Sequence, residues 1–279
     1  MMQEIIHGDA RLMLYPDAPD WDGRRTMAIA KLKCDTAADG VAVIEQAATV
    51  AKAAGAQGLI GPMEGDTWHS YRLVTEGDGS APFLMEPTSK PQDLEAFARA
   101  GFTPISSYFS AAVALSDIPV TTPGPNDAFS IMAWDGTAPE ALFAQVHALS
   151  CQAFAGNPFY KDISLPDFLA MYMPFVPMLK PDLILFARDA QGDLKGFLFG
   201  MPNYAEGPQP ASVILKTYAS LTKGAGHALS SRFYDTARAM GFKTAIHALM
   251  HDDNLSAIRS GMNNAHVFRR YALMGRSLD

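Results

Sequence analysis

The sequence predicts an α/β protein in which helices alternate with the strands of a mixed sheet. Three observations predict this class. Apolar runs typical of strands alternate with helical patterns along most of the chain. Residues 213–254 have the order strand, glycine-containing turn, helix, strand. A proline-rich stretch, Ser116 to Asp127, separates two parts of a 279-residue chain, which is long enough for two cores. We therefore expect domains at 1–118 and 127–279.

The first part of the chain contains one helical pattern after each of two strand-like runs. Strands are expected at 27–34 and 58–63, and a third at 103–115. An alanine-rich helix is expected at 40–54 and a second helix at 92–100. The predicted order is strand, helix, strand, helix, strand.

The second part begins with a strand at 129–134 and helices at 140–154 and 165–175, the latter ended by Pro174 and Pro177. A hairpin is expected from strands at 183–188 and 194–204. A strand at 213–219, a helix ending at Met240 and a strand opened by Gly241 follow, and an apolar run at 267–274 ends the pattern. Residues 51–61 and 237–247 share a helix end, a glycine and a strand start, which fits either a structural duplication or an ordinary glycine at a helix end.

Composition and charge exclude several classes of binding partner. The net charge is −7, and the 22 lysines and arginines are scattered, so no basic stripe is available for a nucleic acid. The only cysteines, Cys34 and Cys151, form no disulfide framework and suit a reducing compartment. The first residues lack the pattern of a signal peptide, and no apolar run approaches the length of a membrane span. We expect a soluble, cytoplasmic protein with no nucleic-acid or membrane partner.

The turn after the strand at 213–219 is the strongest indication of a ligand. Its residues Gly224, Ala225, Gly226, His227 and Ala228 are mostly small, so backbone N–H groups can approach a ligand closely. They open a helix, whose dipole favours an anion at that end. The turn therefore predicts a site for a diphosphate.

The second part resembles the GNAT superfamily of acyl-CoA-dependent N-acyltransferases. Thr217, Tyr218 and Ala219 match the end of the family's fourth strand, and residues 223–228 match its glycine loop, with Lys223 in place of Gln or Arg. Asn254, followed by Ala257 and Ile258, matches an Asn-x-x-Ala-Ile helix start. The resemblance covers residues 127–279 and implies the acyl-CoA N-acyltransferase (GNAT) fold.

The resemblance also implies acetyl-CoA (coenzyme A) as the acyl donor and a cleft where strands four and five splay apart. The cofactor-binding residues that it implies are Leu215, Thr217, Tyr218, Ala219, Lys223, Gly224, Ala225, Gly226, His227, Ala228 and Asn254. In this family an amine attacks the thioester directly, and a strand-four N–H stabilises the oxyanion.

The general acid and base depart from the family pattern. Many members carry a tyrosine seven residues after the motif asparagine, where this chain has Gly261, and the strand at 213–219 carries no carboxylate. Tyr271, in the last apolar run, and His251, just beyond strand five, are the catalytic candidates. For Tyr271 the alternative is an aromatic side chain packed in the final strand.

The first part resembles a shortened, degenerate copy of the same fold that lacks a glycine loop. Its segment 61–72 places Trp68, His69 and Tyr71 in a short loop after a strand. These side chains either line the pocket for the acceptor substrate or join the two domains. Asn157 and Tyr160 lie between two predicted helices where GNAT enzymes shape the acceptor pocket, and a plain turn is the alternative.

Other signals predict less. His247 and His251 have zinc spacing but end a predicted strand, and Cys151 is expected to be a buried, inert thiol. The function expected is transfer of an acetyl group to a primary amine of a small molecule, with a cationic amine mildly favoured by the net charge. One alternative is a non-catalytic acyl-CoA sensor. Another is aminoacyl transfer from tRNA like that of FemX-type relatives, although the lack of a basic surface argues against a tRNA donor. The oligomeric state is left open, a homodimer included.

Overall fold

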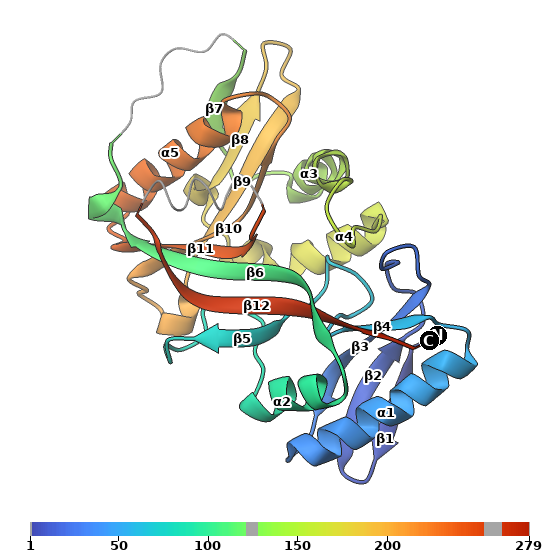
Figure 1. The fold of residues 1–279 in the computed structure, drawn as a ribbon. Helices are drawn as coiled ribbons and strands as arrows, with labels where there is room; N and C mark the ends of the chain where they lie inside the picture. The colour runs from blue at the N-terminus through green and yellow to red at the C-terminus, as the bar shows by residue number, and fades with distance from the viewer. Residues whose placement is uncertain (1, 121–127, 254–263, 279) are drawn as a thin grey trace.

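The computed structural model describes residues 2–120, 128–253 and 264–278 of the chain. One mixed sheet runs through the whole molecule in the order β1-β2-β3-β4-β12-β6-β11-β10-β9-β8-β7, and β5 pairs with β12 (Figure 1). The predicted α/β class is confirmed. Within the described residues, none of the helices combines the length and hydropathy that a membrane-spanning helix requires.

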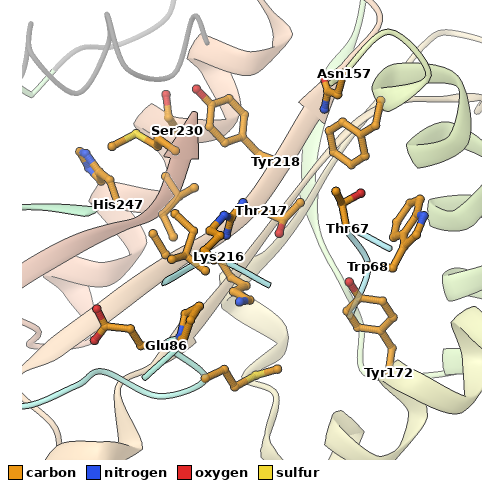
Figure 2. Close-up of a pocket in the computed structure, with 18 of the residues that line it drawn as sticks. Thr67, Trp68, Glu86, Asn157, Tyr172, Lys216, Thr217, Tyr218, Ser230 and His247 are labelled. Carbon is orange, nitrogen blue, oxygen red and sulfur yellow. The ribbon is translucent and has the colours of Figure 1, made fainter. Parts of the chain in front are cut away.

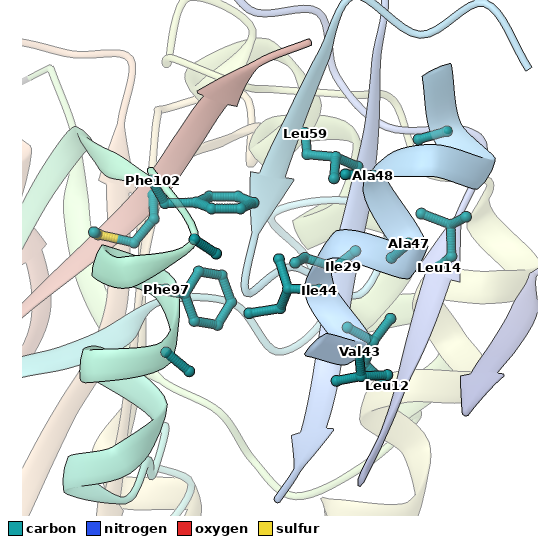
Figure 3. Close-up of a cluster of buried hydrophobic side chains, with 14 of the residues drawn as sticks. Leu12, Leu14, Ile29, Val43, Ile44, Ala47, Ala48, Leu59, Phe97 and Phe102 are labelled. Atoms are coloured by element: carbon teal, nitrogen blue, oxygen red, sulfur yellow. The ribbon is translucent and has the colours of Figure 1, made fainter. Parts of the chain in front are cut away.

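The N-terminal part of the sheet is built around a parallel strand–helix–strand unit. Strand β3 (Thr26–Lys33) leads through helix α1 (Ala37–Ala53) to β4 (Gly58–Gly61), and β3 and β4 pair in parallel. Helix α2 (Pro91–Arg99) packs beside α1. Apolar side chains of both helices and of β2 to β4 form one core, seen in Figure 3 around Ile44 and Phe97.

Three strands of this part were not predicted. A hairpin of β1 (Gln3–His7) and β2 (Ala10–Tyr15) lies at the edge of the sheet, and β5 (Leu73–Gly77) pairs with β12. Gly8 turns the hairpin with φ of 58°. In strand β2, buried residues alternate with exposed or half-buried ones, so the period-two pattern was present in the sequence.

The C-terminal part contains a second parallel strand–helix–strand unit. Strand β10 (Ser212–Ser220), helix α5 (Ala225–Ala239) and β11 (Thr244–His251) follow an antiparallel meander of β7 (Ser130–Ala133), β8 (Ile184–Arg188) and β9 (Leu194–Pro202). Helix α5 buries Leu229 and Phe233 on one face of this sheet. On the other side, Phe143 of α3 (Pro139–Phe154) and Phe168 of α4 (Leu165–Tyr172) share a core with Phe197 of β9.

The two parts exchange their last strands. Strand β6 (Thr103–Ala114) pairs with β11 of the C-terminal part, whereas β12 (His266–Ser277) pairs with β4 and β5 of the N-terminal part. Strands β6 and β12 also pair with each other, side by side across the middle of Figure 1. Each half of the sequence therefore completes the sheet of the other half.

The other predicted elements lie close to the observed ones. Helix α4 ends at Tyr172 and continues as a 3₁₀ helix, Met173–Met178, which contains Pro174 and Pro177. The strand expected at Gly241 begins at Thr244. Residues 121–127 of the predicted linker lie outside the described residues, and the domain boundary stays a prediction.

Candidate functional site

Strands β10 and β11 diverge in the middle of the sheet. Their parallel ladder runs from Ser212 opposite Thr244 to Leu215 opposite His247 and then stops. Beyond it, β10 continues on β9 and β11 continues on β6. The β9 register shifts at Lys216, and the β6 register shifts just after His247. These irregularities bend the strands away from each other and open the sheet between them.

A cavity of about 910 Å³ extends from this opening toward the N-terminal half. One wall comes from β10, β11 and α5, and the other from the loop at 67–72 and from the α3 and α4 side (Figure 2). In Figure 2 the side chains of Tyr218 and His247 lie on the first side, and those of Trp68 and Tyr172 on the second. The cavity is large enough for a small molecule and lies between the two halves of the sequence.

The first turn of α5 is open to an anion. Its N-cap, Gly224, has φ of 88°, provides no side-chain cap, and is followed by no acidic residue in that turn. Ala225 and Gly226 are buried, whereas Lys223 and His227 are exposed, and His227 lines the cavity. Two basic side chains, Lys223 and His227, lie at this helix end, where the backbone N–H groups of Ala225 and His227 donate to carbonyls of the same turn at 3.2 and 3.1 Å. The residues fit the diphosphate of coenzyme A.

Trp68 joins the N-terminal half to the far wall of the cavity. Its indole Nε1 donates to the carbonyl of Lys161 at 2.8 Å, and its ring packs edge-on against Phe154, Tyr160 and Phe168. Asp66 holds the loop, because its carboxylate accepts from the backbone N–H of Trp68 at 2.8 Å. Trp68 therefore lines the cavity and connects the two halves at the same time.

The comparisons with known proteins concern the fold. No protein-family model matches the sequence, and no curated protein matches it. A GCN5-related N-acetyltransferase from Sphaerobacter thermophilus superposes with a TM-score of 0.59 and 13% identity, covering 96% of this chain and 76% of that protein. A tandem GNAT protein from the clavulanic acid biosynthesis pathway superposes with a TM-score of 0.57 and 14% sequence identity, covering 100% of this chain and 83% of that protein.

A GCN5-related N-acetyltransferase from Anabaena variabilis ATCC 29413 gives a TM-score of 0.54 at 9% identity, covering 96% of this chain and 60% of that protein. This chain has the GNAT fold. The likeness covers both halves of the sequence and is not confined to residues 127–279.

The GNAT fold brings many of the predicted site residues to one cavity. The residues that line it, from three separate parts of the chain, are Trp68, His69, Tyr71, Asn157, Tyr160, Leu215, Thr217, Tyr218 and His227. Those outside its lining are Ala219, Lys223, Gly224, Ala225, Gly226, Ala228, His251 and Tyr271. Asn254, Ala257, Ile258 and Gly261 lie outside the described residues.

The two catalytic candidates lie behind the cavity wall. Tyr271 is buried on β12, where its hydroxyl donates to the carboxylate of Glu86 and lies 3.1 Å from Ser110 Oγ. Burial, followed by the bond to Glu86, raises the pKa of Tyr271. The ring of His251 packs against Tyr108 at 5.1 Å. Glu86 is among the residues that line the cavity, but its side chain is fully buried in its pair with Arg269. Both catalytic roles stay predictions.

Several polar residues of the cavity had been given no role, Glu86, Lys216 and His247 among them, whereas Arg72 belongs to the predicted Trp68 loop. Glu86 follows β5, which was not predicted, and Arg72 ends the loop that also carries Trp68. Lys216 is the one charged residue in β10, and His247 ends the β10–β11 ladder. The detectable signal was a lysine in a strand that is otherwise apolar or uncharged.

Burial sets the protonation of two of these residues. It lowers the pKa of His247 to about 4, so this imidazole is neutral at neutral pH, and its Nε2 lies 2.9 Å from the hydroxyl of Tyr234. Burial, followed by the positive charge of Arg72, lowers the pKa of Lys216 to about 8. The opening between β10 and β11 therefore carries a neutral histidine and a lysine that loses its proton easily.

Cys151 is half-buried, and its Sγ lies 3.4 Å from His147 Nε2. That nitrogen also lies 2.8 Å from the carbonyl of Ile163, which can only accept a proton, so Nε2 must donate there. A protonated Nε2 cannot deprotonate the thiol. In the described part of the chain, no group of His, Cys, Asp and Glu side chains has the arrangement of a metal site.

Proposed function

We propose that the protein is an acyl-CoA-dependent N-acyltransferase that transfers an acetyl group to a primary amine of a small molecule. One observation carries this proposal: β10 and β11 diverge onto a cavity that extends to the Trp68 loop. An open path between a donor site and an acceptor pocket suits an enzyme with two substrates. A sensor for acyl-CoA alone has no need of a cavity that extends as far as the Trp68 loop. The free thiols of Cys34 and Cys151 are consistent with a cytoplasmic protein.

The donor would be held by the first turn of α5 and by the diverging part of β10. Residues 223–228 would bind the diphosphate, and the backbone of Leu215 to Ala219 would pair with the amides of the pantetheine arm. Asn254 is proposed to contact the same arm. When bound, acyl-CoA supplies a thioester carbonyl as the electrophile.

The acceptor would enter from the side of Trp68, His69, Tyr71, Asn157 and Tyr160. Its amine would attack the thioester carbonyl carbon after losing a proton to a base, and a backbone N–H of β10 would stabilise the oxyanion. The C–S bond would then break, and coenzyme A would leave as a thiolate that takes up a proton from an acid. Tyr271 donates to the carboxylate of Glu86, which is a residue of the cavity wall, so we propose that Tyr271 acts through Glu86. His251 is the second proposed acid or base.

The first experiment is calorimetric titration of the full protein with acetyl-CoA, with coenzyme A and NADH as controls. Binding at about micromolar strength, roughly 8 kcal/mol, is expected for acetyl-CoA and not for NADH. A screen of amines for release of free thiol would then identify acceptors. Binding without release on any amine would favour the sensor, and no binding would contradict both functions.

A further inference from the structure

The charges that line the cavity do not balance within the protein. Its lining contains two carboxylates, Glu86 and Asp235, and each is already paired with an arginine. Glu86 accepts from Arg269 Nη1 at 2.8 Å and from the backbone N–H of Phe83 at 2.9 Å. Asp235 accepts from Arg238 Nη1 at 2.7 Å. The remaining lysine and arginine side chains in the lining are Arg72 and Lys216.

Arg72 is held in place by aromatic rings. Its guanidinium carbon lies 4.0 Å from the ring centre of Tyr71 and 4.2 Å from that of Tyr108, and Nη2 donates to the hydroxyl of Tyr71. Its Nε is buried and has no hydrogen-bond partner among the described residues. A buried guanidinium N–H without an acceptor is costly, and an anion from outside the protein would satisfy it.

Lys216 brings a second positive charge to the same place. It lies where the β9 register shifts and, in Figure 2, beside Thr217 at the opening of β10. Among the described residues, Arg72 is the charged side chain that lowers the pKa of Lys216, because its positive charge disfavours the ammonium form. Two cations that line one cavity and repel each other are stabilised when an anion binds near both.

We propose that Arg72 and Lys216 form a subsite for an anionic group on the acceptor, so that the substrate is a small amine bearing a carboxylate or a phosphate. The inference rests on the proposed function and specifies its substrate class. A planar guanidinium and a neighbouring ammonium bind either group. The pair lies on the cavity side of β10 and of the Trp68 loop, whereas the proposed diphosphate site lies at the start of α5. The net charge of the protein favoured a cationic acceptor, whereas the positive charges of Arg72 and Lys216 in the cavity favour an acceptor with an anionic group.

The test compares amines that differ only in the anionic group. With acetyl-CoA, thiol release is measured for α-amino acids and for their amides, and for aminoalkyl phosphates and the matching amino alcohols. We expect the anionic member of one series to have a kcat/KM about 10- to 100-fold higher than its uncharged partner. The series that shows the preference identifies the group. Equal use of charged and uncharged partners in both series would overturn the inference.

Variants assign the preference to the pair. Arg72→Gln should abolish the preference, Arg72→Lys should restore part of it, and both should bind acetyl-CoA as the wild type does. Arg24→Gln is the matched control, because Arg24 also stacks on an aromatic ring, that of Trp21, away from the cavity. If Arg72→Gln does not fold, Lys216→Met tests the preference for anionic amines in its place. This variant should fold, because burial disfavours the ammonium group that it removes. Loss of acetyl-CoA affinity with an unchanged preference would show that the pair binds the donor.

A binding measurement separates this inference from the proposed function. Thermal shift without any acyl-CoA is recorded with the same amino acids, amides, phosphates and amino alcohols. Stabilisation by the anionic compounds that Arg72→Gln removes, in a protein that fails to bind acetyl-CoA, would support the subsite and contradict the transferase. Turnover of uncharged amines with no stabilisation by anions would support the transferase and contradict the subsite.

Discussion

The two parallel strand–helix–strand units of this protein share a topology but differ in what lies between their strands. In the N-terminal unit the β3–β4 ladder ends with Ala28 opposite Ile60, and in the C-terminal unit the β10–β11 ladder ends with Leu215 opposite His247. Both ladders are short. Only the second borders the large cavity.

The N-terminal unit is closed immediately after its last pair. The backbone N–H of Met63 donates to the carbonyl of Ile29 at 2.9 Å, and Met63 is fully buried. Gly61 lies so close that a Cβ there would be 2.6 Å from the same carbonyl oxygen. In the C-terminal unit both strands continue past the ladder on other partners, so the space between them stays open.

The N-terminal ends of helices α1 and α5 also differ, and again only the C-terminal unit is open. Helix α1 is capped by Thr36, whose Oγ1 accepts from the N–H of Asp39 at 3.2 Å, and Asp39 adds a negative charge in the first turn. Helix α5 begins at Gly224 with no side-chain cap. The comparison shows that topology alone does not make a binding site. The proposed donor site depends on an uncapped helix end and on strands that separate.

The largest expected effect comes from a residue of the N-terminal half that serves the C-terminal cavity. Trp68→Ala should lower kcat/KM for the amine by about 100-fold, because misplacing the acceptor raises the barrier. Acetyl-CoA binding should be unchanged in calorimetry. Trp21→Ala, a half-buried tryptophan outside the cavity lining, is the control. Equal losses in both variants would mean that Trp68 only joins the two halves.

The helix end is tested by two glycines of one helix with the same backbone strain. Gly224 and Gly241 lie at opposite ends of α5 with φ of 88° and 90°. Alanine at either position should cost about 1 kcal/mol of stability. Only Gly224→Ala should also weaken acetyl-CoA binding, by about tenfold or more, since its methyl group obstructs the anion site. Similar affinities in the two variants would contradict the loop assignment, and Gly226→Val extends the test to a bulkier side chain.

Gly61→Ala tests the closure of the N-terminal unit. Its Cβ would approach the backbone oxygen of Ile29, which cannot move without shifting β3, so we expect a loss of about 1 to 3 kcal/mol in chemical denaturation. Gly156→Ala is the control, because no atom lies within 4 Å of a Cβ at that position. A fully stable Gly61→Ala protein would show that the unit can open.

The smallest effect concerns the last rung, where Ile60 in one unit corresponds to His247 in the other. Burial lowers the pKa of His247 from 6.5 to about 4, so the unfolded chain takes up the proton more readily. The contribution of neutral His247 to the free energy of unfolding is complete above pH 6.5 and is lost as the pH falls toward 4. His247→Gln should therefore show a shallower fall of Tm over that range. If His247→Gln altered this pH dependence of Tm no more than the exposed His7→Gln does, the lowered pKa of His247 would be refuted.

Most helices and strands were predictable because each depends on a local pattern. The alanine-rich α1 and the apolar β10 show their periods in a short window. The β1–β2 hairpin was missed although β2 alternates, and β5 is short and half exposed. The exchange of β6 and β12 could not be predicted, because pairing between residues so far apart in sequence leaves no local signal.

For the site, the sequence by itself determined the glycine turn, the aromatic loop around Trp68 and the order of the strands that carry them. Those features depend on backbone freedom and side-chain type, which are local properties. The tertiary structure alone decided that Arg72 and Lys216 share one cavity, while Glu86 and Asp235 are paired with other arginines. Burial and the balance of charges depend on distances between residues far apart in the chain, so only the folded protein sets them.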